Sequence, residues 1–381
     1  MSRPVVIVAA RRTPVAPRGG AFAKLSIADL ATPVLQAVLR DADVATEDVD
    51  GVILGNALYG GGNPARVVAL AAGLPEQVPA MTIDTQCCAG IDAVSLAAAK
   101  IASGEAEVII AGGAESFSRS SLRMHRPLDP ADTPEEYSRP PFTPWPDRDP
   151  DMLEAAAALA ATRGVSRTEQ EAFAVESHRL ALADDLVRTE IVETAGVSVD
   201  AFTRPLTAKA CARLPLLEGA PETGLTAATT AVEADAAAVL LVMSEEAAAR
   251  IGLTKKSIRV TASASVGDDP AMPAIAPVAA ITTLVSRTGR SAADYDVIEL
   301  MEAFAVQAMT NIADLCLDPA KVNARGGALA RGHPIGASGA ILLVRLYHDL
   351  MQGSAKSGLA AIAGAGGLGS AMAFERLSEH A

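Results

Sequence analysis

Residues 80–113 read AMTIDTQCCAGIDAVSLAAAKIASGEAEVIIAGG. The stretch opens with Ala80–Ile83, which predicts a buried strand, and closes with a second apolar run, Val108–Ala111, followed by two glycines. Between these runs, Ala89–Ser103 is rich in small residues and predicts a helix. A strand, a helix and a strand in this order predict a βαβ unit, the building block of layered α/β proteins.

The same alternation of short apolar runs and helical patterns extends over most of the chain. Further strands are expected at Val5–Ala10, Val52–Leu54, Ala236–Val242 and Ile258–Val266. Further helices are expected from an N-cap at Ser26 through Leu39, and at Pro64–Ala72, Met152–Arg163 and Thr168–Arg188. We therefore predict an α/β fold in which helices cover a sheet.

The second half of the chain echoes the first. The strand that follows Asp48-Val-Asp-Gly-Val-Ile has a counterpart after Asp294-Tyr-Asp-Val-Ile-Glu. In each half a helix follows, and then a glycine-containing turn opens a second helix, at Cys87–Gly90 and at Gly332–Gly339. Each half ends with an apolar strand that runs into clustered glycines. We interpret this pattern as a duplicated domain with a pseudo-twofold axis.

The composition excludes several classes of protein. Of the 381 residues 50% are hydrophobic, which is too apolar for a disordered chain. The net charge of −13 gives no overall attraction for nucleic acid or an anionic membrane surface. The six-residue apolar run Val5–Ala10 is too short for a signal peptide or a membrane span. Four cysteines without metal-ligand spacing predict no disulfide framework and no metal site, and they favour a reducing cytoplasm.

Cys87 is the first candidate for chemistry, because it lies where a strand ends and a helix of small residues begins. Backbone N–H groups and the helix dipole at such a position are expected to stabilise a thiolate and lower the pKa of the thiol. The same N–H groups can receive the oxyanion of a thioester under attack. The alternative is that Cys87 and Cys88 are small buried hydrophobic residues, as most free cysteines are.

His333 is the second candidate, embedded in the loop Asn323-Ala-Arg-Gly-Gly-Ala-Leu-Ala-Arg-Gly-His-Pro-Ile-Gly-Ala-Ser-Gly339. Its glycines permit close approach of a ligand to the backbone, and Pro334 fixes the start of a helix. A structural turn with an incidental histidine is the alternative. Because Cys87 and His333 occupy equivalent places in the two half-repeats, a pseudo-twofold axis would bring them together as a nucleophile and its base.

Four stretches resemble the thiolase family, and the resemblance covers essentially the whole chain. Cys87-Cys-Ala-Gly is similar to the nucleophile motif of the family, and Gly112-Gly-Ala-Glu-Ser to the strand after it. Glu302-Ala-Phe-Ala matches most of a third motif, and Gly326–Gly339 resembles the histidine motif almost letter for letter.

The resemblance implies a fold and a division into domains. The fold is α/β, with duplicated βαβαβαββ domains that form a five-layer α-β-α-β-α sandwich and an inserted loop domain. We expect residues 1–115 and 190–250 to form the first half, residues 116–189 a loop and helical insertion that covers the active site, and residues 251–381 the second half.

The resemblance also implies the roles of the site residues. His333 would take the thiol proton of Cys87, whose sulfur would then attack an acyl thioester, and the backbone N–H groups of Cys87 and Ala365 would bind the oxyanion. No cofactor is expected to stay bound, since the substrate is a thioester of coenzyme A or of an acyl carrier protein. A homodimer formed where the sheets of two subunits meet, or a homotetramer, is implied as well.

Three positions depart from the family pattern. The second family cysteine, which moves the proton of the α-carbon nucleophile, is Ala363 here, and alanine cannot exchange a proton. The asparagine that helps to bind the enolate oxygen is Met301, and loss of one such donor typically costs about a hundredfold to a thousandfold in rate. The segment that holds the pantetheine arm in relatives reads Thr226–Asp235 and includes Ala231 instead of the usual Gly, Asn and Ser.

These departures lead to three hypotheses about function. The first is an acyltransferase that is acylated on Cys87 but passes the acyl group to an amine, a hydroxyl or an unusual carbon acid. The second is an ordinary acetyl-CoA C-acyltransferase, in which water or Cys88 compensates for the losses. The third is a non-catalytic subunit that binds an acyl thioester or partners an active homologue.

Basic side chains are candidates for binding the phosphates of coenzyme A. Arg204 and Arg213, with Lys209 between them, could meet a diphosphate, and Ala231 belongs to the expected pantetheine segment. The proline-rich loop after Ser116 offers further arginines, for which a solvated surface loop is the alternative.

Overall fold

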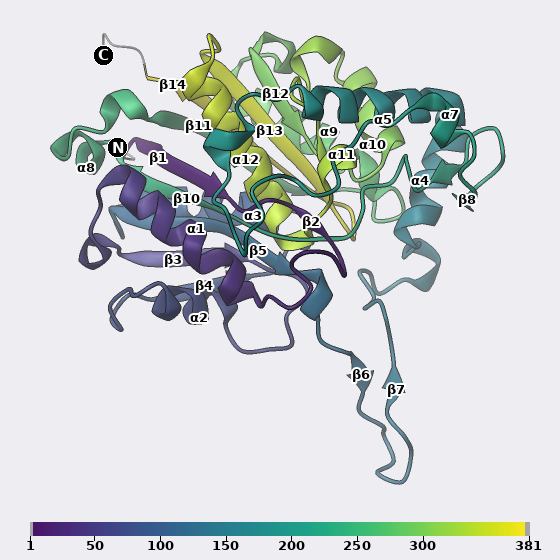
Figure 1. Ribbon diagram of the computed structural model, residues 1–381, viewed down its shortest axis with the longest axis horizontal. Helices are drawn as coiled ribbons and strands as arrows, with labels where there is room; N and C mark the ends of the chain where they lie inside the picture. The colour runs from purple at the N-terminus through teal and green to yellow at the C-terminus, as the bar shows by residue number, and fades with distance from the viewer. Residues whose placement is uncertain (1–2, 378–381) are drawn as a thin grey trace.

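The computed structural model describes residues 3–377, and within them one hydrogen-bonded sheet of ten strands runs through the molecule (Figure 1). The first half contributes β1 (Val5–Arg12), β3 (Gly51–Gly55), β4 (Ala80–Ile83), β5 (Val108–Ser116) and β10 (Ala234–Ser244), with the short β2 (Ala16–Pro17) beside β10. The second half contributes β11 (Ile258–Gly267), β12 (Val297–Leu300), β13 (Ser357–Gly364) and β14 (Leu368–Arg376). The strands of the two parts meet where β1 pairs with β11, at Val6–Arg259 and Ile7–Ile258.

The strand order confirms the duplication. The first part has the order β4-β3-β5-β10-β1 and the second has β12-β13-β14-β11. In each part the strand that follows the inner helix is parallel to its outer neighbour (β5 to β3, β13 to β12), and the next strand is antiparallel to it. An isolated parallel bridge between Ile298 and Val322 takes the place that β4 has in the first part.

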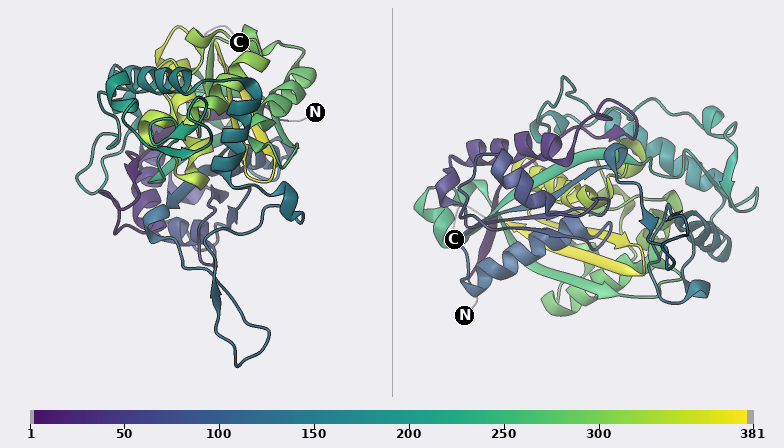
Figure 2. Two further views of the ribbon diagram at one scale, coloured as in Figure 1. Left: turned by 90° about the vertical axis from the view of Figure 1, so that its right-hand side faces the viewer. Right: turned by 90° about the horizontal axis from the view of Figure 1, so that it is seen from below.

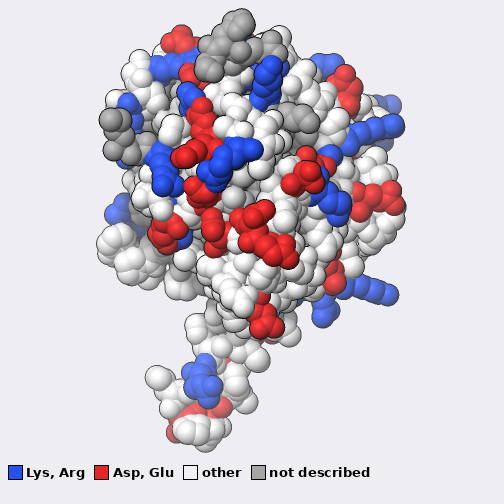
Figure 3. Space-filling model, turned by 90° about the vertical axis from the view of Figure 1, so that its left-hand side faces the viewer, with Lys and Arg blue, Asp and Glu red and all other residues white. Residues whose placement is uncertain are grey.

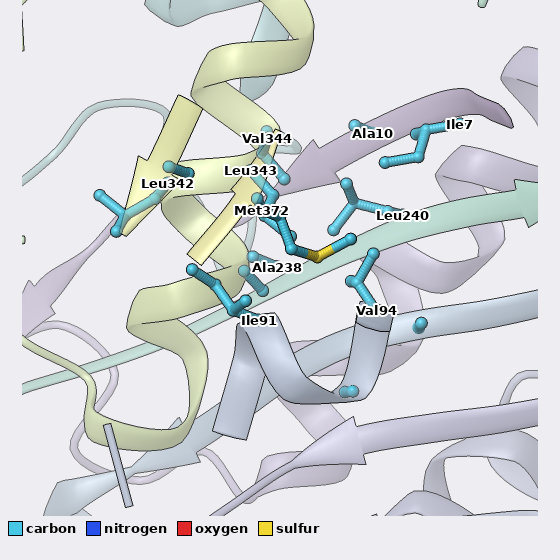
Figure 4. Close-up of a cluster of buried hydrophobic side chains, with 14 of the residues drawn as sticks. Ile7, Ala10, Ile91, Val94, Ala238, Leu240, Leu342, Leu343, Val344 and Met372 are labelled. Atoms are coloured by element: carbon cyan, nitrogen blue, oxygen red, sulfur yellow. The ribbon is translucent and has the colours of Figure 1, made fainter. Parts of the chain in front are cut away.

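Helices lie on both sides of each part and between them, which gives five layers. The outer helices α1 (Ile27–Ala42) and α2 (Pro64–Ala71) cover the first part, and α9 (Ala276–Thr288) covers the second, with α10 (Ala305–Asp314) next to α9. The inner helices α3 (Ala89–Ser103) and α12 (Ile335–Gln352) form the middle layer. In Figure 4, side chains of α3 and α12 meet side chains of β1, β10 and β14 in this central core.

Glycines allow the two inner helices to approach each other at their N-termini. A Cβ atom added to Gly90 would lie 2.4 Å from the backbone nitrogen of Ala340, and one added to Gly339 would lie 2.7 Å from that of Ile91. Contacts this short do not occur between real side chains, so only glycine fits at the crossing. The beginnings of α3 and α12 are therefore held side by side, as the pseudo-twofold axis requires.

The segment between β5 and β10 contains the remaining elements of the first half. They are β6 (Met124–His125), β7 (Glu135–Glu136), α4 (Met152–Arg163), α5 (Arg167–Leu182), α6 (Val187–Glu190), α7 (Ala208–Cys211), β8 (Leu216–Glu218) and β9 (Leu225–Thr226). β6 and β7 pair in a hairpin, residues 123–137, that projects from the body as an arm (Figures 1 and 2). The arm points away from the body (Figures 1 and 2), whereas α4 packs against α10 in the body. Two short helices, α8 (Glu245–Arg250) and α11 (Ala328–Arg331), complete the fold.

A buried network of charges fixes the segment after α5 to both halves. The carboxylate of Asp184 accepts hydrogen bonds from Arg325 at 2.8 Å and from Arg331 at 2.9 Å. The guanidinium of Arg12 donates to Glu190 at 2.8 Å and to Asp200 at 2.7 Å. Because each of these charges is paired, the network can be buried without leaving an isolated ion.

Candidate active site

Cys87 and His333 lie face to face at the N-termini of the two inner helices. The Sγ atom of Cys87 is 3.2 Å from Nε2 of His333, across 246 residues of sequence. Cys87 directly precedes Cys88, the N-cap of α3, and Gln86 before it has a φ of 55°, a left-handed conformation that turns the chain sharply from β4 into the helix. This contact confirms that the pseudo-twofold axis joins the two loops.

A second hydrogen bond determines the tautomer of His333. It leaves the nitrogen that faces the sulfur of Cys87 without a proton. Nδ1 of His333 is 2.6 Å from the hydroxyl oxygen of Ser338, and that hydroxyl donates its own proton to the carbonyl oxygen of Pro334 at 3.0 Å. The oxygen of Ser338 is therefore left to accept a hydrogen bond from Nδ1–H of the neutral ring. Nε2 then carries the lone pair toward the thiol of Cys87, which is the arrangement a general base requires.

Burial dominates the protonation of the pair. It raises the pKa of the Cys87 thiol to about 12, against an opposing effect of the N–H groups of Cys87 and Ala365, and it lowers the pKa of His333 to about 4. The expectation that the start of the helix would lower the pKa of Cys87 is thus wrong in sign, because desolvation outweighs the backbone dipoles. At neutral pH the site contains a neutral thiol and a neutral imidazole, so the thiolate forms only when His333 takes the proton.

The backbone N–H groups of Cys87 and Ala365 both favour the thiolate form of Cys87 and oppose the rise of its pKa. Ala365 lies in the loop between β13 and β14. Two backbone donors that converge beside a nucleophile are the elements of an oxyanion hole, and they do not depend on the side chain at either position.

The pair lies in the wall of a cavity of about 220 Å³. Most of its lining is apolar and comes from several elements, with Phe117, Phe142, Met152, Ala155, Ala156, Phe304 and Ile335 among the residues. Within residues 3–377, the titratable side chains that line it are those of Cys87, Glu233 and His333. A largely apolar pocket with a few polar groups is typical of a site for a small organic ligand.

The positions that depart from the family pattern do not all lie in the wall of the cavity. Ala363 and Ala231 line the cavity. Met301 does not; its side chain is 1% exposed and packs into the central core behind the site. Cys88 is fully buried, with its Sγ atom 3.7 Å from the carbonyl oxygen of Ile362, and it also does not line the cavity. The geometry thus gives no support to Cys88 as a substitute for the missing cysteine.

Neither of the arginines predicted to bind phosphate reaches the cavity wall. The guanidinium of Arg204 stacks on Phe202, 3.9 Å from the ring centroid, and Arg213 is exposed near α7. In the proline-rich segment, Arg139 and Arg148 pair with Asp149 and Asp269 instead of facing the cavity. A role of Arg204 and Arg213 in binding stays a prediction.

Two side chains that organise the site, those of Ser338 and Glu115, were not predicted from the sequence. Ser338 sets the tautomer of His333, although it was part of the quoted histidine motif. Glu115, in the quoted Gly112-Gly-Ala-Glu-Ser stretch, accepts hydrogen bonds at 3.0 Å from the backbone N–H groups of Ala57 and Gly336, and so anchors the start of α12 to the end of β5. Burial raises the pKa of Glu115 to about 7. The motifs that contain Ser338 and Glu115 were the signal that could have found these two residues. Their hydrogen-bond partners depend on tertiary contacts.

The described residues contain no group of three or more His, Cys, Asp or Glu side chains that could hold a metal ion, and none of their helices is long and apolar enough to cross a membrane. On the face drawn in Figure 3, acidic and basic side chains alternate without a large basic area. That face therefore offers no extended surface for a polyanion.

Comparisons with known proteins agree with this geometry. Residues 5–246 match the family model of the thiolase N-terminal domain, and residues 254–376 match that of the thiolase C-terminal domain. An acetyl-CoA acetyltransferase of Thiocystis violacea is 38% identical over 99% of this chain and 100% of its own length. A beta-ketoadipyl-CoA thiolase of Pseudomonas knackmussii is also 38% identical, with the same coverage. The crystal structure of human mitochondrial 3-ketoacyl-CoA thiolase in complex with CoA superposes with a TM-score of 0.89 at 29% identity, covering 99% of this chain and 98% of that one. The chain belongs to the thiolase family.

Proposed function

We propose that the protein is an ordinary acetyl-CoA C-acyltransferase, which exchanges acyl groups between coenzyme A and the α-carbon of acetyl-CoA through an acyl thioester on Cys87. The observation that carries the proposal is the 3.2 Å contact between Sγ of Cys87 and Nε2 of His333 in the wall of the cavity. The names of the relatives favour this carbon–carbon chemistry over transfer to another acceptor.

The acylation step follows from the geometry. Nε2 of His333 takes the thiol proton as the sulfur of Cys87 attacks the carbonyl carbon of an acyl-CoA. The N–H groups of Cys87 and Ala365 bind the oxyanion. The carbon–sulfur bond to coenzyme A then breaks, the leaving thiolate takes the proton back from His333, and the acyl group remains on Cys87. No metal or redox partner enters this balance.

Mass spectrometry of the intact protein tests the acylation step. We expect a mass increment of one acyl group after exposure to acetyl-CoA, and no stable thioester in Cys87→Ser. A wild-type protein that acquires no increment with acetyl-CoA or with longer acyl-CoAs would refute the proposal and leave a non-catalytic thioester-binding subunit as the explanation. Thiolysis of acetoacetyl-CoA by coenzyme A then tests the carbon–carbon step.

A second candidate is the transfer of the acyl group from Cys87 to an amine, a hydroxyl or an unusual carbon acid. It is favoured by Ala363, which places a methyl group in the cavity wall where relatives carry a proton-transferring cysteine. Acylation of Cys87 without thiolysis of acetoacetyl-CoA would support this candidate over the first.

Three broader assignments belong to the same proposal. We propose the division into residues 1–115 with 190–250, 116–189 and 251–381, and an assembly that is a homodimer or a homotetramer, which sedimentation would measure. The four cysteines are free within the described structure, which suits a reducing compartment such as the cytoplasm.

A further inference from the structure

Carbon–carbon bond formation needs a group that removes a proton from the α-carbon of acetyl-CoA, and the site must supply it. Ala363 has no titratable group, and Cys88 does not line the cavity. During this step the sulfur of Cys87 carries the acyl group and cannot act as a base. Of the titratable side chains that line the cavity within residues 3–377, His333 and Glu233 remain.

His333 is committed to the sulfur atom. Its Nε2 faces Sγ of Cys87 at 3.2 Å, and its Nδ1 is bound to Ser338 at 2.6 Å. The ring is thus fixed at both nitrogens in the orientation that serves proton transfer to and from Cys87. The other titratable residue that lines the cavity is therefore the candidate base for an incoming carbon nucleophile.

Glu233 lines the same cavity and lies directly beside His333 in the backbone. It forms an isolated parallel bridge with His333, whose N–H donates to the carbonyl oxygen of Val232 at 2.7 Å. The carboxylate of Glu233 accepts a hydrogen bond from Arg18 at 2.8 Å, and both side chains are about half exposed. Glu233 thus places a carboxyl group on a residue that lines the cavity, in an ion pair that is partly open to solvent.

Building on the proposed function, we propose that Glu233 is the general base of the carbon–carbon step and replaces the cysteine absent at residue 363. A Cα–H proton of acetyl-CoA passes to the carboxylate of Glu233, and the carbanion attacks the acyl carbonyl carbon on Cys87. As the new carbon–carbon bond forms and the bond to the sulfur of Cys87 breaks, the thiolate is released. The proton that Glu233 accepted then returns the thiolate of Cys87 to the thiol. The products are a 3-ketoacyl-CoA and the free enzyme; thiolysis is the reverse.

The test compares the two half-reactions in Glu233→Gln, which keeps the size of the side chain but cannot accept a proton. Acylation by acetyl-CoA, followed by intact mass, is expected to stay within about threefold of the wild type. Thiolysis of acetoacetyl-CoA is expected to fall by about 10²–10⁴-fold, the usual contribution of a general base. Arg18→Gln, which removes the same ion pair but leaves the carboxylate, is the matched control and should keep most of the thiolysis activity.

Ala363→Cys in the Glu233→Gln background supplies an independent readout, because a thiol at residue 363 restores a proton acceptor to the cavity. Recovery of thiolysis in this double variant supports the assignment, and its absence counts against it. Thiolysis by Glu233→Gln at the wild-type rate, or an equal loss in both half-reactions, overturns it. Failure of the wild-type protein to acylate Cys87 would instead refute the proposed function, so the two failures are distinguishable.

Discussion

Ser338 gives the sharpest test of how the site is organised. It is 3% exposed, and its hydroxyl oxygen is the partner of Nδ1 of His333 at 2.6 Å. Ser338→Ala leaves the Nδ1–H group buried without an acceptor, which costs about 1–3 kcal/mol. The ring can avoid this cost by moving its proton to Nε2, where it faces Cys87 and can no longer act as a base. If the cost falls on the reactive tautomer, acylation slows by about five- to 150-fold.

Single-turnover acylation by acetyl-CoA measures this loss, and ¹⁵N NMR of labelled histidine reports the tautomer directly. We expect the wild-type ring to carry its proton on Nδ1 and Ser338→Ala to show protonation shifted to Nε2. Ser95→Ala is the matched control, since it removes a hydroxyl from α3 that is hydrogen-bonded to Ser263 at 2.9 Å, away from the site. Wild-type acylation rates in Ser338→Ala, or an unchanged tautomer, would show that Ser338 does not position His333.

Three further predictions concern protonation, packing and buried charge. The folded-state pKa of His333 is about 4, and only the neutral ring accepts the thiol proton. The acylation rate should therefore be flat above about pH 5 and fall as the pH drops through 4. A midpoint near 6.5 in the pH profile would contradict this. Gly90→Ala should lower the free energy of unfolding by about 1–3 kcal/mol and slow acylation, because its Cβ would lie 2.4 Å from the backbone nitrogen of Ala340. Gly267→Ala, with open space around its Cβ, should change neither quantity in the same denaturation and acylation assays. Asp184→Asn leaves the arginines around it short of a negative charge and should lower the free energy of unfolding, measured in denaturant, by on the order of 3–5 kcal/mol. Asp314→Asn, in the exposed pair with Arg163, should lower it by less than about 1 kcal/mol. Equal losses of stability in the two variants would refute the contrast.

Elements with local signals were predictable from the sequence. The predicted bounds of β4, α3 and α4 agree with the observed ones. α4 has a capping box from Asp151 to Glu154 and ends at Gly164 in the left-handed conformation, and both features can be read in the sequence. Where such signals are weak the prediction failed: the helix expected over Thr168–Arg188 ends at Leu182. The chain there turns so that Asp184 can pair with buried arginines, a tertiary contact that no local pattern announces.

The site was predictable in its residues but not in its energetics. Cys87 and His333 came from the motifs and from the duplication, and their contact follows from the symmetry of the fold. The pKa of Cys87 was predicted with the wrong sign, because the helix start is a local feature whereas desolvation depends on everything packed around the sulfur. Glu233 was not singled out, because its segment differs from the family pattern and only the folded structure shows that residue 233 lines the same cavity as Cys87.

The two half-reactions differ in how they depend on side chains. Acylation uses the pair Cys87 and His333 together with backbone donors at Cys87 and Ala365, so a change of side chain at residue 363 does not remove any of its parts. Proton transfer at the α-carbon depends on a side chain, and it is lost when cysteine becomes alanine unless another group in the same cavity can take its place. The methyl group of Ala363 leaves that part of the wall inert, while the proposed base, Glu233, is a residue of another part of the lining. A substitution that affects proton transfer at the α-carbon can therefore be compensated without disturbing acylation. The oxyanion of acylation is bound by backbone groups, whereas proton transfer at the α-carbon depends on the side chains that line the cavity.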